Sequence, residues 1–263
     1  MENKVMTQQD MMNLLDTLYG KTVNGVPKVS PPVDELAEEY LKKYSDPKDA
    51  AKKLIDTQII KCTTSGVVTG LGGIITLPVT VPANIASVLY VQMRMITAVA
   101  YMSGLDIKSD EVQTFVYACL AGVSIANLLQ SVGVQIGEKL AVAAIKKIPG
   151  KVLVSINQKV GFRLITKFGT KGVLNLGKMV PGIGAVVGGV FDFSETKIIG
   201  NRAIKMFFDG DLMLNDDKSV VAFEDVAEVA EAEVEDLSSE EVIDCAAPNA
   251  WLIYHKFWRI CYE

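Results

Sequence analysis

The sequence predicts an all-α protein, a compact apolar helical bundle with glycine-rich helices, and three observations favour this fold class. Several segments of helical length carry apolar residues at helical spacing and begin at capping residues. Residues 63–93 form a run of 31 residues without a charged side chain. Hydrophobic residues make up 49% of the chain and its mean hydropathy is +0.28, which is high for a soluble protein but low for a polytopic transporter.

The chain divides into three regions of different composition. Residues 1–32 are weakly patterned and end in glycines and prolines, so we expect a flexible N-terminal lead-in with a short helix at residues 8–18. Residues 33–208 hold most helical segments and form the predicted domain. Residues 209–263 form an acidic tail with an aromatic-rich end. The first residues lack a basic stretch followed by an apolar run, so no secretory signal is expected.

Capping residues mark the first helices of the domain. Residues 33–44 have the spacing of an amphipathic helix. Asp46 and Pro47 then begin a second helix, because an aspartate side chain accepts hydrogen bonds from the first N–H groups and proline fits the first helical position. We therefore expect two consecutive helices before the uncharged run.

The uncharged run at residues 63–93 is long enough to cross a bilayer, for which about 20 apolar residues suffice. Pro78 and Pro82 lie near its middle, and proline removes a backbone donor and clashes with the preceding helical turn. The run therefore predicts two apolar helices joined at a bend, either re-entrant in a membrane or buried in a helical core. The second helix begins at Pro82 and ends at Gly104, because glycine readily adopts the left-handed conformation.

Later helices are expected over residues 109–130, 152–168 and 183–208. Ser109 is a capping residue followed by two acidic residues, which the helix dipole favours. Asp209 and Gly210 end the last of these helices. Residues 74–81 and 152–156 are rich in β-branched side chains, so short strands remain an alternative there.

Charge is distributed unevenly along the chain. Residues 209–244 carry 14 acidic residues and one basic residue, a net charge of −13, whereas residues 1–208 carry +7. Residues 139–191 contain nine basic residues and no acidic one. A basic body with an acidic tail suggests that the body meets an anionic surface, and a tail that solvates or masks the body is compatible with this. Nucleic acid is not an expected partner, because the tail would compete with it and no stacking aromatics accompany the basic residues.

A basic stripe is expected on the helix at residues 152–168 and its exit. Its members recur every four residues and are assigned to lipid binding: Lys159, Arg163, Lys167 and Lys171. Cations beside apolar residues are typical of a helix that lies on an anionic lipid surface. An ordinary solvated helix face remains the alternative.

Small residues and prolines predict close helix packing. Glycines four residues apart let helices approach closely, in membranes especially, although 21 glycines give roughly two such pairs by chance. The residues assigned to membrane contact or helix packing are Gly66, Gly70, Pro78, Pro82, Gly184 and Gly188. Close packing in a soluble bundle is equally compatible with this spacing.

A small and polar stripe follows one side of the last helix, at Gly184, Gly188, Asp192, Thr196 and Gly200. Burial of Asp192 is costly unless the carboxylate is paired. Arg94 is equally isolated in apolar sequence and is its candidate partner. We expect a buried polar pair between the two, which either lines a polar path or is purely structural.

No constellation for catalysis or metal binding is visible. The four cysteines have no CxxC spacing, and the single histidine lies near the C-terminal end. The cysteines are interpreted as reduced packing residues of a cytosolic protein. We therefore expect no enzyme activity, no metal and no cofactor.

Four segments carry a resemblance, at residues 64–84, 92–96, 157–169 and 177–189. The most specific parts are Leu-Pro-Val-Thr-Val-Pro-Ala-Asn at residues 77–84 and Asn-Gln-Lys-Val-Gly-Phe-Arg-Leu at residues 157–164. Together they resemble the EcsC protein family of bacteria over roughly residues 33–208. The resemblance implies an α-helical, apolar protein of the bacterial cytoplasm or the inner membrane face. The founding member is associated with an ABC transporter operon, and the family has no established catalytic residues to carry over.

These observations predict a non-enzymatic helical protein at the cytoplasmic face of the bacterial inner membrane, peripheral or partly inserted. Its partners would be an anionic lipid surface and a membrane transporter or another protein, in an accessory role in transport or secretion. Two alternatives stay open. One is a soluble helical bundle that holds a lipid or another apolar ligand, and the other is a membrane-permeabilising effector.

Overall fold

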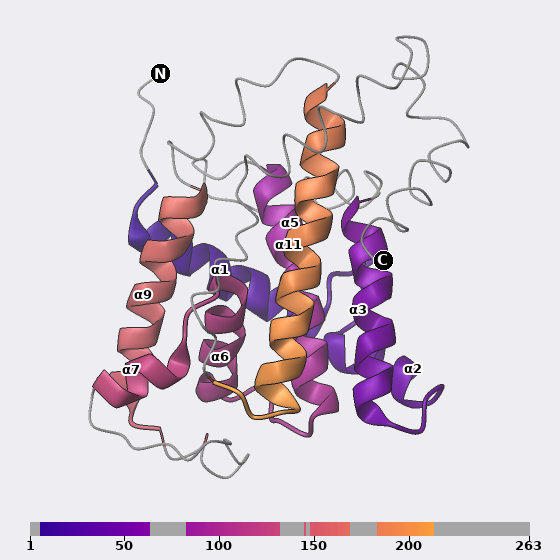
Figure 1. The fold of residues 1–263 in the computed structure, drawn as a ribbon, viewed down its shortest axis with the longest axis horizontal. Coiled ribbons are helices and arrows are strands. Elements are labelled where there is room, and N and C mark those ends of the chain that lie inside the picture. The colour runs from indigo at the N-terminus through magenta and orange to yellow at the C-terminus, as the bar shows by residue number, and fades with distance from the viewer. Residues whose placement is uncertain (1–5, 64–82, 132–144, 146–147, 169–182, 213–263) are drawn as a thin grey trace.

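The computed structural model describes residues 6–63, 83–131, 145, 148–168 and 183–212 (Figure 1). These parts of the chain contain eight α-helices and no β-strand, which confirms the predicted all-α class. The helices are α1 (Gln8–Asn24), α2 (Val33–Leu41), α3 (Pro47–Thr63), α5 (Ala83–Met102), α6 (Asp110–Ala121), α7 (Ile125–Ser131), α9 (Gly150–Phe168) and α11 (Ile183–Phe207).

Helix α5 is the centre of the bundle. It packs against α1, α2, α3, α6 and α11, and residues 89–100 are all buried. The end of the uncharged run at residues 63–93 therefore lies in a helical core, whereas residues 64–82 lie outside the described part. Burial by five neighbouring helices explains why so apolar a helix is stable without a lipid around it.

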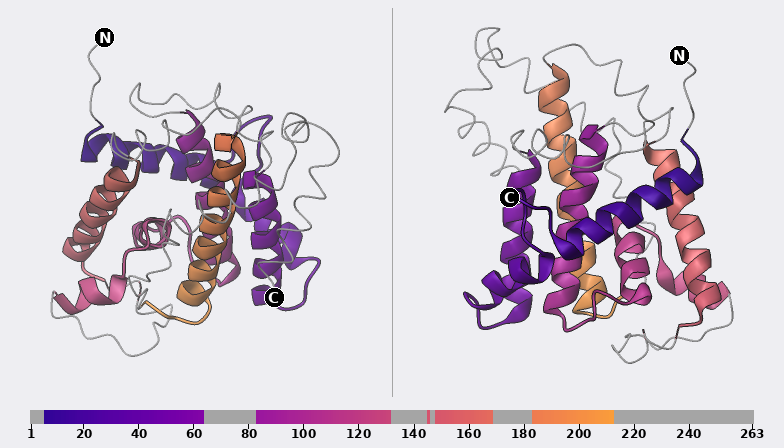
Figure 2. Two further views of the ribbon diagram at one scale, coloured as in Figure 1. Left: turned by 45° about the horizontal axis from the view of Figure 1, so that its top comes forward. Right: turned by 180° about the vertical axis from the view of Figure 1, so that it is seen from behind.

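Helix α1 belongs to the same core. The helix expected at residues 8–18 is present and continues to Asn24, so the prediction of a flexible segment directly after residue 18 is wrong. Thr7 and Asp10 form a reciprocal capping box at its start. Its buried face is made of residues at helical spacing: Met11, Leu14, Leu15, Leu18, Tyr19 and Thr22. Seen from behind, α1 runs across α5 to α9 (Figure 2). The burial of this face fixes the helix in place.

The single helix expected over residues 109–130 is two helices, α6 and α7. Gly122 has a left-handed φ of 66°, and the amides of Gly122 and Val123 bond back to the carbonyls of Cys119 and Ala118. This pattern ends a helix and satisfies its last carbonyls. A Cβ atom at Gly122 would lie 2.7 Å from a guanidinium nitrogen of Arg202 on α11, so the break also makes room for that side chain.

Other predicted helix limits are confirmed. Gly104 ends α5 with a φ of 85°, and α11 ends before Asp209 and Gly210. Asp209 also pairs with Lys48 of α3 at 2.6 Å. Residues 152–156 are helical in α9, so the strand alternative is excluded there. Among the helices of the described ranges, none has both the length and the apolar character needed to span a membrane.

Candidate functional site

Helix α9 lies at the edge of the bundle and is the element on which the predicted basic stripe falls. It packs against α1, α6 and α7, on the side of the molecule opposite α2 and α3 (Figure 1). The side of α9 that faces the core consists of buried side chains spaced four residues apart: Val152, Ile156, Val160 and Leu164. The amide Nε2 of Gln8 donates to the carbonyl of Gln158 at 2.7 Å, which ties α1 to this helix.

The opposite side of α9 faces solvent and combines cations with large apolar side chains. Phe162 is 70% exposed and Val154 is 57% exposed, at positions eight residues apart on one helix face. Lys151 and Lys159 are exposed beside them. Helix α9 contains four basic residues and no acidic one. We call the set Lys151, Val154, Lys159 and Phe162 the α9 outer face.

The predicted basic stripe only partly coincides with the α9 outer face. Residues four positions apart drift by about 40° around a helix, so Arg163 lies nearer to the core than Lys159. Lys159 is exposed and Arg163 is half-buried. The side chain of Lys167 on α9 and the whole of Lys171 lie outside the described residues.

Apolar neighbours are expected beside the stripe at Val160, Phe162, Leu164, Ile165 and Phe168. Val160 and Leu164 are buried against the bundle, so they are not available to a lipid surface. Phe162, also expected beside the stripe, is exposed, and so is Val154, which was not among the expected neighbours. The signal that would have identified Val154 is its helical spacing from Phe162, on the side opposite Val160.

Arg94 is buried at 6% exposure inside the core of the bundle. Its Nη1 atom donates to the carbonyl of Pro31 at 2.6 Å, and its guanidinium lies 5.8 Å from the centre of the Tyr90 ring. The Tyr90 hydroxyl is 2.7 Å from the Ser30 hydroxyl. Arg94 thus anchors the segment that joins α1 to α2. The side chain of Asp192 on α11 lies outside the described residues, so the predicted pair stays a prediction.

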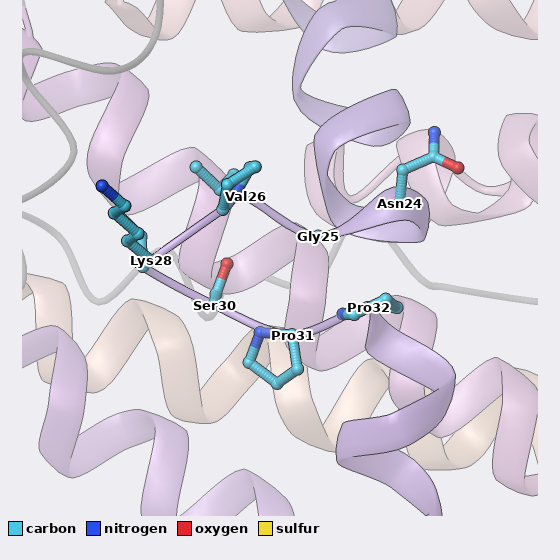
Figure 3. A pocket seen from close by; sticks show the side chains of 9 residues that line it. Asn24, Gly25, Val26, Lys28, Ser30, Pro31 and Pro32 are labelled. Atoms are coloured by element: carbon cyan, nitrogen blue, oxygen red, sulfur yellow. The ribbon is translucent and has the colours of Figure 1, made fainter.

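The segment anchored by Arg94 borders an open hollow lined by residues 24–32, with Lys28 beside it at a φ of 66° (Figure 3). The lining residues include three prolines, two valines and one lysine, and none of them is acidic, a histidine or a cysteine. Within the described ranges, no group of three or more His, Cys, Asp or Glu residues is placed to hold a metal ion. The hollow therefore offers no set of side chains for acid–base or metal chemistry.

Two residues of the small and polar stripe predicted on α11, Thr196 and Gly200, are described by the structure. Both lie where α11 packs against other helices. Thr196 is completely buried and accepts a hydrogen bond from Nε2 of Gln92 on α5 at 3.1 Å. A Cβ atom at Gly200 would lie 2.5 Å from Cγ2 of Ile55 on α3. These two positions let α11 approach α5 and α3 closely.

The remaining packing residues are only partly described. Gly184 and Gly188 belong to α11, but contacts at these positions lie outside the described set. Gly66, Gly70, Pro78 and Pro82 all fall in residues 64–82, outside the described ranges. Their assignment to membrane contact or helix packing stays a prediction.

The profile of the EcsC protein family matches residues 33–208, more than half of the chain. The chain belongs to the EcsC protein family. The match begins at the first residue of α2 and ends just after α11, so α1 is an addition to the matched region that shares its core. No curated protein and no solved structure matches the chain.

Proposed function

We propose that this EcsC-family protein is a non-enzymatic protein that docks on the cytoplasmic face of the bacterial inner membrane. The observation that carries the proposal is the α9 outer face, where Phe162 and Val154 are exposed together with Lys151 and Lys159. Exposed apolar side chains among cations are typical of surfaces that lie on anionic lipid. The resemblance to EcsC suggests that such docking serves a membrane transporter.

The strength of such docking depends on two contributions. Each lysine near an anionic membrane surface contributes about 1 kcal/mol. Burial of a phenylalanine or valine side chain contributes about 1.5–3 kcal/mol. Two lysines and two apolar side chains give reversible, salt-sensitive association, because the electrostatic part is screened within about 8 Å at physiological ionic strength.

The proposal is tested by sedimentation of the full chain with vesicles. Vesicles of phosphatidylcholine with about 30% phosphatidylglycerol are compared with vesicles of phosphatidylcholine alone. The double variant Lys151→Gln/Lys159→Gln should bind the anionic vesicles about 30-fold more weakly, as two lost lysines at about 1 kcal/mol each imply. The variant Phe162→Ser should reduce binding on both kinds of vesicle.

The matched control is Lys42→Gln/Lys108→Gln, which removes the same charge from two exposed positions outside α9. It should leave binding within about twofold, because these lysines are not on the docking surface. Equal losses for both double variants would contradict docking through α9. Absence of vesicle binding by the unaltered protein and by every variant would contradict the proposed function itself.

In cells, the same proposal predicts how membranes release the protein. A high-salt wash should remove it, because the attraction between α9 and lipid headgroups is screened. Release only by detergent would show insertion of other segments. Recovery of the whole population in the soluble fraction would contradict membrane docking.

A further inference from the structure

The chain leaves the described part of the molecule beside the start of α7. The carbonyl of Leu212 accepts hydrogen bonds from the Ser124 hydroxyl at 3.3 Å and from the Ala126 amide at 3.2 Å. Ser124 and Ala126 lie at the start of α7, which packs against α9. In Figure 1 the end of α11 turns toward α6 and α7, away from α3. The acidic tail therefore starts on the α9 side of the bundle.

The composition of the acidic segment at residues 216–244 complements the α9 outer face. This segment carries 12 acidic residues and one basic residue, whereas α9 carries four basic residues and no acidic one. Valines and alanines alternate with these acids, at positions such as Val226, Val229 and Val234. The segment thus contains anionic partners for Lys151 and Lys159 together with apolar partners for exposed Phe162.

We propose that the acidic segment at residues 216–244 docks on the α9 outer face of the same chain and competes there with anionic lipid. This inference rests on the proposed function, because it makes lipid docking a regulated event. When carboxylates of the same chain occupy the α9 outer face, lipid binds there only after displacing them. Membrane surfaces of high negative charge density are therefore preferred, because they compete best with these carboxylates.

Geometry permits this contact without strain. Helix α9 is roughly 28 Å long at about 1.5 Å per residue. The 16 residues from Leu212 to Glu228 span up to about 50 Å when extended. Because both partners are in one chain, the effective concentration of the segment near the face is in the millimolar range. Weak individual contacts therefore suffice to keep the face covered.

The first test needs no lipid. A zero-length carbodiimide reagent joins a lysine amine to a carboxylate only when the two are in contact. In the full chain at low salt, Lys151 and Lys159 should couple to acids of residues 216–244 at least fivefold more often than Lys42 and Lys108, measured by peptide mass spectrometry of the monomer band. Equal coupling of all four lysines, or coupling only in a dimer band, would overturn the proposal.

The second test measures competition on the same anionic vesicles. The variant Glu228→Gln/Glu231→Gln/Glu233→Gln/Glu235→Gln should bind at least 10-fold more tightly than the unaltered protein. The matched control is Glu35→Gln/Glu39→Gln/Asp49→Asn/Asp56→Asn, which removes four exposed acids from α2 and α3, far from α9. It changes net charge equally and should alter binding less than threefold. Equal gains would overturn the proposal.

The two tests separate this inference from the proposed function. Selective coupling to Lys151 and Lys159 with no vesicle binding by any variant would support the intramolecular contact and contradict lipid docking. Vesicle binding that depends on Phe162 but not on the tail acids, without selective coupling, would support lipid docking and overturn the tail contact.

Discussion

Helices α5 and α9 are nearly equal in length, with 20 and 19 residues, yet they occupy opposite environments. Residues 89–100 of α5 are all buried, Arg94 included. Helix α9 buries one side and exposes Phe162, Val154 and two lysines on the other. The more apolar helix is thus the more completely buried one over its described residues.

This difference shows that the apolar content of a helix indicates burial. It does not indicate whether protein or lipid surrounds the helix. Five neighbouring helices surround α5, so protein replaces the lipid that its composition would also suit. On α9 the informative residues are the few apolar ones that the core leaves exposed.

The largest expected effect comes from truncating one large apolar side chain in each helix. Leu89→Ala removes a buried side chain of α5 and should lower the free energy of unfolding by about 2–5 kcal/mol. Phe162→Ala on α9 should change it by no more than about 0.5 kcal/mol, because the ring is exposed. Urea unfolding followed by circular dichroism measures both. Equal losses would mean that the Phe162 ring is packed as tightly as the buried Leu89 side chain.

A second prediction concerns how closely α11 approaches the central helices. Gly200→Leu forces side-chain atoms against Ile55 and should destabilise the protein by about 1–3 kcal/mol. The control is Gly20→Ala on α1, where nothing lies within 4 Å of the new Cβ atom. That substitution should stabilise the helix by about 0.5–1 kcal/mol. Thermal unfolding of the two variants should therefore shift in opposite directions.

A third prediction tests the buried cation of α5. Arg94→Met keeps much of the side-chain volume but leaves the Pro31 carbonyl without its donor. The expected cost is about 1–3 kcal/mol, with faster hydrogen exchange at the amide of Ser30 in the anchored segment. Lys108→Met at an exposed position is the control and should cost less than about 0.5 kcal/mol. Unaltered exchange at Ser30 would show that Arg94 does not anchor the segment.

A fourth prediction concerns a loss of stability in alkali. Burial raises the pKa of Cys119 to about 12, and burial followed by the charge of Asp16 raises the pKa of Tyr117. Burial and then Asp106 raise the pKa of Tyr19. Above pH 9–10 the unfolded chain loses these protons while the folded chain keeps them, so stability falls with rising pH.

Each such group lowers the free energy of unfolding by up to about 1.4 kcal/mol per pH unit in that window. Urea unfolding between pH 8 and 11 measures the slope. The variant Tyr19→Phe/Tyr117→Phe should flatten it, whereas Tyr44→Phe at an exposed position should not. A slope unaffected by the double variant would assign the alkaline transition to other groups.

Much of the fold was predictable because local signals agree with the tertiary structure. Ser109 accepts a hydrogen bond from the amide of Val112, as a capping residue should. Gly104 ends α5 where its left-handed conformation was expected. The end of α1 was predicted too early, at residue 18, because Gly20 lies inside the helix and glycine is typical of helix ends. The break at Gly122 was missed because a lone glycine is also tolerated within a helix.

The candidate site was predictable only in part. Lys159 was identified from its four-residue repeat and is exposed, but the same repeat carries Arg163 toward the core. Lys151 and Val154 were not selected, because only the packing of α9 against α1, α6 and α7 shows which of its sides remains outside.

The sequence by itself determined the all-α class, the family and the division into a basic body and an acidic tail. The class and the division depend on caps, spacing and charge, which are local or additive properties. The family rests on its resemblance to particular segments, residues 77–84 and 157–164 above all. Only the tertiary structure decided that α5 is enclosed by protein, that Arg94 bonds to Pro31, and that Phe162 is left exposed. Burial depends on which helices meet, and contacts between segments far apart in the chain are not encoded in any one of them.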